Sequence, residues 1–151
     1  MINIRRAGVR DGELLSDIAY RSEAYWGYDL DFMEKFKVVY QITEDFLNRS
    51  ETYIIEDNGN AVGFYSLLVK DKVASLEYLY IDAQSIGKGY GKKLWNHLVN
   101  ITCKNLEVKE FTFVANPGAK DFYLKLGAIY LGEAESKLKK GFMLPKFVYK
   151  I

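Results

Sequence analysis

The chain is poor in the residues that build most kinds of active site. Its 151 residues include one cysteine, Cys103, and one histidine, His97. One cysteine excludes an intrachain disulfide, and a metal site built on a single His and a single Cys is not expected. A Ser-His-Asp triad would have to use His97, which lies within a helical pattern with no nucleophile elbow beside it. We expect His97 to be a solvated or partly packed helix residue and Cys103 to be a small buried hydrophobe on a helix.

The chain also lacks a large excess of charged residues of either sign. Lysine and arginine number 21 and acidic residues 20, which leaves a net charge of +1. This balance gives no electrostatic footprint for nucleic acid or for an anionic membrane. The first residues, Met1-Ile2-Asn3-Ile4-Arg5-Arg6, carry charges too early for a signal peptide, and no apolar run could span a bilayer. We therefore expect a cytoplasmic protein with no nucleic-acid or membrane partner.

The composition and the hydrophobic pattern predict one folded domain over residues 1–151. Apolar residues make up 49% of the chain, which excludes disorder, and there are no repeats or linkers. Three adjacent strands with short turns predict an antiparallel meander, and the next strand must return past a helix and so lie parallel to the third. The result is a mixed α+β fold. Strands are expected at 2–7, 52–56, 61–69, 73–81, 110–114, 128–131 and 142–149, and helices at 11–23, 30–40, 43–48, 89–104 and 117–126.

The most informative segment is the glycine-rich stretch 84–93, with the sequence QSIGKGYGKK. It follows a strand-like run and precedes a helix-like run. Glycines at alternate positions let backbone amides approach a ligand, and the helix adds unpaired N–H groups and the positive end of its dipole. The lysines around the loop add positive charge. This arrangement predicts an anion site, most naturally for a phosphate or pyrophosphate.

Two common phosphate motifs do not fit the glycine-rich stretch. The dinucleotide fingerprint needs glycines at the first, third and sixth places, but Lys92 holds the sixth place here. The ATP and GTP loop needs four residues between its glycines and then Lys-Ser or Lys-Thr. Gly87 and Gly91 have three residues between them, and Lys93 stands where the hydroxyl residue would be.

A third pattern does fit. The run Gln84-x-x-Gly87-x-Gly89 resembles the acyl-CoA pyrophosphate loop of the GNAT N-acetyltransferase superfamily. A second block resembles that of the same superfamily: Asn116, then Ala119, the aromatic pair Phe122-Tyr123, and Gly127 at the end of the helix. The two blocks stand in the family's order, and the resemblance covers residues 52–131 well. The N-terminal third and the last twenty residues match only in outline.

The resemblance implies the GNAT acyl-CoA N-acyltransferase fold, in which a mostly antiparallel sheet is flanked by helices. The sheet would splay between the strands at 73–82 and 109–114, with acetyl-CoA or CoA in the gap. The backbone of Leu79 and Ile81 would pair with the acyl carbonyl and the pantetheine amides, and a fixed N–H would stabilise the oxyanion of a tetrahedral intermediate. The implied cofactor contacts are Leu79, Tyr80, Ile81, Gln84, Ser85, Ile86, Gly87, Lys88, Gly89, Tyr90, Gly91, Lys92, Asn116, Phe122 and Tyr123.

The resemblance also implies catalytic side chains. The Tyr123 hydroxyl could protonate the departing CoA thiolate, although a tyrosine pKa of about 10 needs help from its environment. Its alternative role is one more core tyrosine. Glu77, on the cofactor strand, is a candidate general base, directly or through a water, and its alternative role is a surface carboxylate paired with a lysine. Asn116 would bind the pantetheine arm or, alternatively, cap a helix.

The segment Tyr25-Trp26-Gly27-Tyr28-Asp29 joins the first two helices and, in this fold, overhangs the acceptor cleft. Tyr25, Trp26, Tyr28 and Asp29 could hold a cationic amine, or the rings could simply close the core. We expect an acetyltransferase that moves acetyl from acetyl-CoA to a small-molecule primary amine. The alternatives are a non-catalytic acyl-CoA-binding module and a protein lysine or N-terminal acetyltransferase. The apolar stretch 142–149 is compatible with a homodimer and equally with a core strand.

Overall fold

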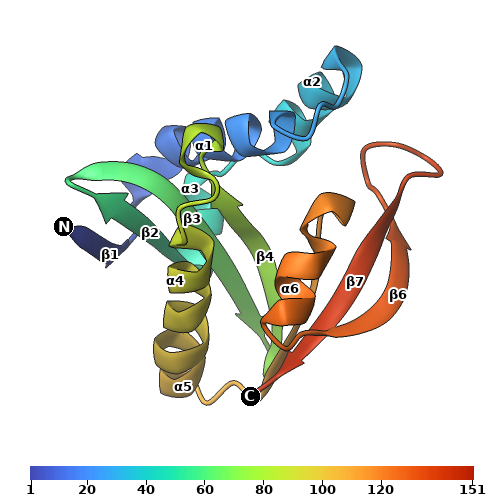
Figure 1. Ribbon diagram of the computed structural model, residues 1–151. Coiled ribbons are helices and arrows are strands. Elements are labelled where there is room, and N and C mark those ends of the chain that lie inside the picture. The colour runs from blue at the N-terminus through green and yellow to red at the C-terminus, as the bar shows by residue number, and fades with distance from the viewer.

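One seven-stranded sheet runs through the whole chain in this computed structural model, which describes residues 1–151 (Figure 1). The strand order is β1-β2-β3-β4-β5-β7-β6. All neighbouring strands are antiparallel except β4 and β5, which are parallel. The meander and the parallel return are therefore confirmed. The strands are β1 (Ile2–Arg6), β2 (Glu51–Asp57), β3 (Asn60–Lys70), β4 (Val73–Ile81), β5 (Glu110–Val114), β6 (Ile129–Glu135) and β7 (Met143–Lys150).

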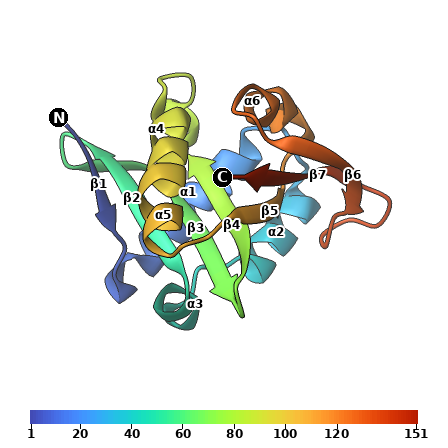
Figure 2. The same cartoon turned by 90° about the horizontal axis from the view of Figure 1, so that it is seen from below.

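Helices cover both faces of the sheet, and each face has its own core. A cluster of 12 buried residues joins the first three helices to one face, and a cluster of 18 joins the later helices to the other. In the view from below, α4 and α5 lie across β2 and β3, while α6 lies on the side of β7 (Figure 2). The helices are α1 (Gly12–Ala24), α2 (Leu30–Val39), α3 (Glu44–Arg49), α4 (Tyr90–His97), α5 (Cys103–Asn105) and α6 (Lys120–Lys125).

Local signals set most element boundaries. Thr43 accepts a hydrogen bond from the Phe46 amide at the start of α3, the capping contact that threonine commonly makes there. Gly59 has a positive φ of 82° in the turn between β2 and β3, and Gly127 has one of 96° just after α6. Such backbone conformations favour glycine, so these turns follow directly from the sequence.

The expected continuous helix over 89–104 is wrong in one detail. A π-helical turn over Leu98–Thr102 separates α4 from α5. Near this wider turn the buried Tyr65 hydroxyl lies 2.8 Å from Nδ1 of His97 and 2.6 Å from Oγ1 of Thr102. Both neighbours satisfy a hydroxyl that would otherwise be buried without partners. His97 is therefore packed on the helix, and Cys103 is fully buried, as predicted.

The feature that creates the site is the divergence of β4 from β5. The two strands pair only at Ala74–Phe111 and Ser75–Thr112. Just beyond, β4 contains one extra residue relative to β3, because Ser66 pairs with Tyr78 while Leu67 pairs with Leu76. Glu77 is this bulge residue. A bulge bends and twists its strand, so it turns β4 away from β5, and Figure 1 shows β4 and β7 spreading apart toward α2.

Candidate active site

A cleft of about 840 Å³ opens where β4 and β5 separate. Its walls are the unpaired part of β4 and the end of β5, from Thr112 to Asn116. The beginning of α4 closes one end, and aromatic side chains from the α1–α2 segment, α2 and the segment after β6 close the other. The cleft contains 13 of the 15 residues expected to contact the cofactor: Leu79, Tyr80, Ile81, Ser85, Ile86, Gly87, Gly89, Tyr90, Gly91, Lys92, Asn116, Phe122 and Tyr123.

The glycine-rich loop has the geometry of an anion cradle. Gly87 and Gly89 have positive φ angles of 88° and 85°, and no atom lies within 4 Å of where a Cβ would stand on either residue. The loop surface is therefore bare backbone. The first helical bond inside α4 is from the Lys93 amide to the Gly89 carbonyl at 3.3 Å, so the N–H groups of the preceding residues have no acceptor within the helix. Gly91 is held close to Phe122, whose Cζ lies 3.1 Å from the Cβ that Gly91 lacks.

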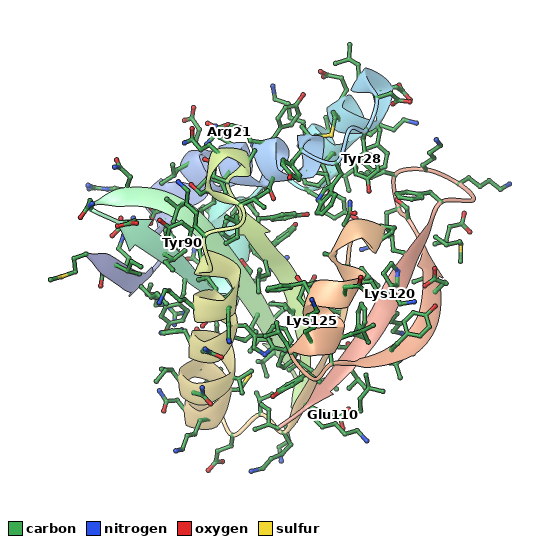
Figure 3. The ribbon with its side chains drawn as sticks, viewed as in Figure 1. Arg21, Tyr28, Tyr90, Glu110, Lys120 and Lys125 are labelled. Atoms are coloured by element: carbon green, nitrogen blue, oxygen red, sulfur yellow. The ribbon has the colours of Figure 1, made fainter.

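Two of the expected cofactor side chains point elsewhere. Gln84 and Lys88 line a second, smaller hollow of about 540 Å³ on the other side of the loop. Arg21 in this hollow holds the buried Asp82 carboxylate through two hydrogen bonds of 3.1 and 2.8 Å. The pair ties α1 to the end of β4, immediately before the loop. Figure 3 shows Arg21 beside the coil that precedes α4, and Tyr90 well below it at the start of the helix.

Tyr90 contributes to the cleft mainly by anchoring the start of α4 to the sheet. Its ring is buried in the core, and its hydroxyl donates a hydrogen bond to the Asp57 carboxylate at the end of β2. This contact anchors the first residue of α4 to the sheet. A backbone that is fixed in this way holds the unpaired N–H groups of the helix end in place beside the cleft.

Tyr123 lies where a catalytic acid could act. It is only 6% exposed, it lines the cleft, and its hydroxyl has no hydrogen-bond partner in the protein. Its ring packs against Phe113 and Trp95, with centroid distances of 4.7 and 5.7 Å. Burial raises the pKa of Tyr123 above its ordinary value, so the hydroxyl keeps its proton at neutral pH.

Glu77 lines the cleft at the bulge in β4. Its side chain is exposed, and Oε2 accepts a hydrogen bond of 2.9 Å from the Ser75 hydroxyl. Glu77 forms no salt bridge, so the alternative role as a surface carboxylate paired with a lysine is not what the structure shows. The carboxylate therefore borders the cleft and is open to solvent.

The segment between α1 and α2 roofs the cleft through two of its four candidate residues. Trp26 lies flat against Gly118, where a Cβ would come within 2.3 Å of its ring. Tyr28 lines the cleft, and its hydroxyl accepts a hydrogen bond from Nδ2 of Asn116. These contacts join the N-terminal helices to the turn after β5, across the cleft, and Figure 3 shows Tyr28 above the opening.

The other two candidates lie outside the cleft. Asp29 caps α2, since its Oδ1 accepts a hydrogen bond of 2.8 Å from the Phe32 amide. Tyr25 is 54% exposed and packs edge-on against Trp26. Asn116 makes the capping contact that was its alternative role, because its Oδ1 accepts from the Gly118 amide at 2.9 Å, while its Nδ2 faces the cleft.

Sequence reasoning missed Glu23, the most perturbed carboxyl group of the cleft. It lies on the last turn of α1, and its Oε1 is 3.5 Å from Nδ2 of Asn116. Burial raises the pKa of Glu23 to about 7, and the hydrogen bond from Asn116 opposes that shift. A signal was available: Leu15 and Ala19 are buried at helical spacing, and Glu23 continues the same stripe.

The residues present fit acetyl-CoA. The bare glycine loop and the start of α4 offer N–H donors for a pyrophosphate, with Lys92 beside them. The unpaired length of β4 beyond Ser75 offers backbone groups for the pantetheine amides. β4 runs from one end of the cleft to the other. One extended ligand along it can therefore touch the glycine loop, β4 and the aromatic end.

Comparison with known proteins agrees with this geometry. The model of the acetyltransferase (GNAT) family matches residues 18–128, so the chain belongs to that family. Acetyl-CoA is the cofactor of this family, and the chain is therefore an acyltransferase that uses acetyl-CoA. None of the curated protein sequences matches the chain.

Solved structures share the fold over almost the whole chain. One is the PaiA N-acetyltransferase of Thermoplasma acidophilum, in complex with coenzyme A, at 20% identity and a TM-score of 0.79, covering 100% of this chain and 99% of that chain. A GCN5-related N-acetyltransferase of Rhodopseudomonas palustris gives 18% identity and a TM-score of 0.82, with 99% and 95% covered. The ribosomal-protein-S18-alanine N-acetyltransferase of Escherichia coli gives 17% and 0.72, with 98% and 91% covered.

Two further findings describe the molecule as a whole. None of its helices is long and apolar enough to cross a lipid bilayer. No three side chains of His, Cys, Asp or Glu come together in a way that could hold a metal ion.

Proposed function

We propose that this acyltransferase moves the acetyl group of acetyl-CoA to the primary amine of a small molecule. The observation that carries the proposal is the cleft itself, which leads from the glycine loop to an aromatic end roofed by Trp26 and Tyr28. An acceptor at that end would reach the cofactor between β4 and β5. A roofed, largely apolar pocket favours a compact acceptor over a protein surface.

The chain offers groups for direct attack by the amine on the thioester. A backbone N–H of β4, at Leu79 or Ile81, would stabilise the developing oxyanion. Tyr123 would give its proton to the departing thiolate and recover one from the nitrogen of the new amide. Glu77 remains the sequence-based prediction for the general base. The proposed binding roles of the cofactor residues follow from their place along the cleft.

An acyl-enzyme route through Cys103 is disfavoured. Its side chain is fully buried in the core between the sheet and α4, and it does not line the cleft. Burial raises the pKa of the Cys103 thiol to about 11, so the thiolate needed for attack is scarce at neutral pH.

The test is acetyl transfer to a panel of acceptors, read out as thiol release. The panel holds small primary amines, lysine-containing peptides and peptides with free N-termini, each with acetyl-CoA at saturation. Turnover with a small amine, well above that with the peptides, supports the proposal. Faster turnover with peptides would assign a protein substrate instead, and acetyl-CoA binding without turnover on any acceptor would leave a binding module.

A further inference from the structure

Glu23 is a half-buried carboxylate in the cleft with no cationic partner. The protein's salt bridges involve Arg5, Arg6, Arg21, Lys35, Arg49 and the N-terminus, and none of them reaches Glu23. Its one hydrogen bond in the protein is the 3.5 Å contact from Asn116. A buried carboxylate without a partner is costly, because burial disfavours its ionised form. A cation from outside the chain would remove that cost.

Aromatic rings surround this end of the cleft. Tyr28 stacks on Phe32 with a centroid distance of 4.2 Å, and Phe142 meets Tyr28 edge-on at 5.6 Å. Tyr40 and Tyr80 line the same region, and the charge of Glu23 acts on both of their hydroxyls. Ring faces attract cations and also bury an apolar ligand body, so the rings and the carboxylate suit the same ligand.

Other charges of the cleft lie at its rim. Glu77 and Glu135 are both exposed, and each accepts a hydrogen bond from within the chain, from Ser75 and from the Gly141 amide. The cleft lysines Lys92, Lys137 and Lys146 are exposed as well, and Lys137 lies in the segment after β6. Glu23 is therefore the one charged residue lining the cleft that is not exposed to solvent. A single shielded negative charge matches a monoamine. No positive side chain is shielded beside it, which disfavours an acceptor with its own carboxylate next to the amine.

We propose that Glu23 binds the ammonium group of the acceptor and takes its first proton, and that the acceptor is a primary monoamine with an aromatic or branched apolar body. The proposal rests on the proposed acetyl transfer and names its substrate class. Proton transfer to the Glu23 carboxylate leaves a neutral amine, whose lone pair forms the new C–N bond to the thioester carbonyl carbon. The C–S bond then breaks. The second proton of the nitrogen reaches the CoA sulfur through Tyr123, and Glu23 returns the first proton to solvent.

This assignment differs from the sequence-based prediction, which placed the general base at Glu77. A base with a pKa near the working pH transfers protons efficiently, and burial gives Glu23 such a pKa of about 7. The groups that face it stay neutral across this range: burial raises the pKa of Tyr28 to about 12 and raises those of Tyr40 and Tyr80 as well. Asn116 carries no charge. Besides burial, the charge of Glu77 raises the pKa of the neighbouring Tyr40 and Tyr78 hydroxyls.

The experiment measures kcat and KM by thiol release with 2-phenylethylamine, spermidine and phenylalanine as acceptors, between pH 5.5 and 9. We expect kcat/KM for 2-phenylethylamine to exceed that for the other two by at least about tenfold, and to rise through a transition near pH 7. Glu23→Gln should lower kcat/KM by on the order of 100-fold and abolish the transition. Glu77→Gln should keep the transition. Glu13→Gln, an exposed change in the first turn of α1, should behave as wild type.

Calorimetry with acetyl-CoA separates the role of Glu23 from the proposed acetyl transfer itself. The affinity of Glu23→Gln for acetyl-CoA should stay within about twofold of wild type. Glu23→Asp retains a carboxylate and is the second variant should Glu23→Gln prove unstable. It should keep part of the activity. Preference for spermidine or phenylalanine, or an intact pH transition in Glu23→Gln, overturns this inference while acetyl transfer stands. Absence of turnover with every amine overturns both.

Discussion

At the scale of single residues, Tyr123 is the proposed proton donor to the departing CoA thiolate. Removing only its hydroxyl in Tyr123→Phe should lower turnover by on the order of 100-fold, because the departing thiolate then has no positioned proton donor. The fold should survive, since the ring and its contacts with Phe113 and Trp95 remain. Steady-state thiol release and acetyl-CoA calorimetry on the same sample measure the two effects.

Tyr149→Phe is the matched control for that variant. Tyr149 belongs to the same aromatic cluster, with its ring centroid 5.0 Å from that of Trp95, but it does not line the cleft. It should therefore leave turnover unchanged. Equal turnover in Tyr123→Phe and wild type would remove Tyr123 from the chemistry and leave it a core residue.

The raised pKa of Glu23 also makes the stability of the protein depend on pH. Its folded pKa of about 7 lies above the ordinary value of 4.5, so between these values the folded state binds more protons than the unfolded state. Stability from this group is complete below pH 4.5 and is lost as the pH rises through 7. Glu23→Gln should accordingly gain on the order of 2 kcal/mol relative to wild type at pH 8, and much less at pH 5.

Urea unfolding of both proteins at the two pH values measures this difference. Glu13→Gln serves as the control, since that carboxylate is exposed on the same helix. A gain in Glu23→Gln that is the same at both pH values would contradict a buried carboxylate with a raised pKa.

At the scale of elements, the glycine loop should matter for binding beyond its effect on stability. Gly89→Ala places a side chain at a φ of 85°, which costs about 1 kcal/mol, and adds a methyl group to the bare surface that faces the pyrophosphate. Gly59→Ala is a matched control, because Gly59 has a φ of 82° with equally open space but lies in the turn between β2 and β3. Both variants should lose similar stability in urea, and only Gly89→Ala should lose acetyl-CoA affinity. Equal affinities would move the anion site away from the loop.

The contact between the α1–α2 segment and the turn after β5 is the second prediction at this scale. Gly118→Ala pushes its methyl group into the Trp26 ring, where 2.3 Å is far too short a separation. The ring must move, so the roof opens, and KM for the amine should rise several-fold with a loss of about 1–3 kcal/mol in stability. Trp26→Ala should remove the clash, and the double variant should therefore be less destabilised than the sum of the single ones. Strict additivity would show that the two residues do not touch.

Local elements of this fold could be predicted because their signals are local. The turn at Gly59, the Thr43 cap and the end of α6 at Gly127 each depend on a few neighbouring residues. The bulge at Glu77 could not be read, because it depends on the register of β4 against β3. Likewise, nothing in the chain order shows that β7 inserts between β5 and β6, because that pairing joins segments far apart in the sequence.

The candidate site divides in the same way. The glycine loop and the block from Asn116 to Gly127 are contiguous motifs, and the structure brings both to one cleft. Asp29 and Tyr25 were expected there because of their position between two helices, but capping and exposure decide their orientation. The buried stripe of α1 could have pointed to Glu23, but its surroundings come from Tyr28, Asn116 and β4, which meet only after folding.

At the scale of the whole molecule, the bulge, the splayed strands and the helices on both faces build one continuous site. The sheet supplies a rigid frame, because β4 stays paired with β3 along its length while its other edge opens. α1 is tied to that frame through Arg21 and Asp82, and α6 through the packing of Tyr123. A homodimer and a cytoplasmic location stay predictions.

The most direct test of the central claim is a calorimetric titration of the whole chain with acetyl-CoA, with CoA, NAD and ATP titrated in parallel. We expect saturable binding of acetyl-CoA and CoA at one site per chain, and no binding of NAD or ATP. Binding of ATP or NAD in the absence of any heat from acetyl-CoA would contradict the assignment of the cleft, and the proposed chemistry would fall with it.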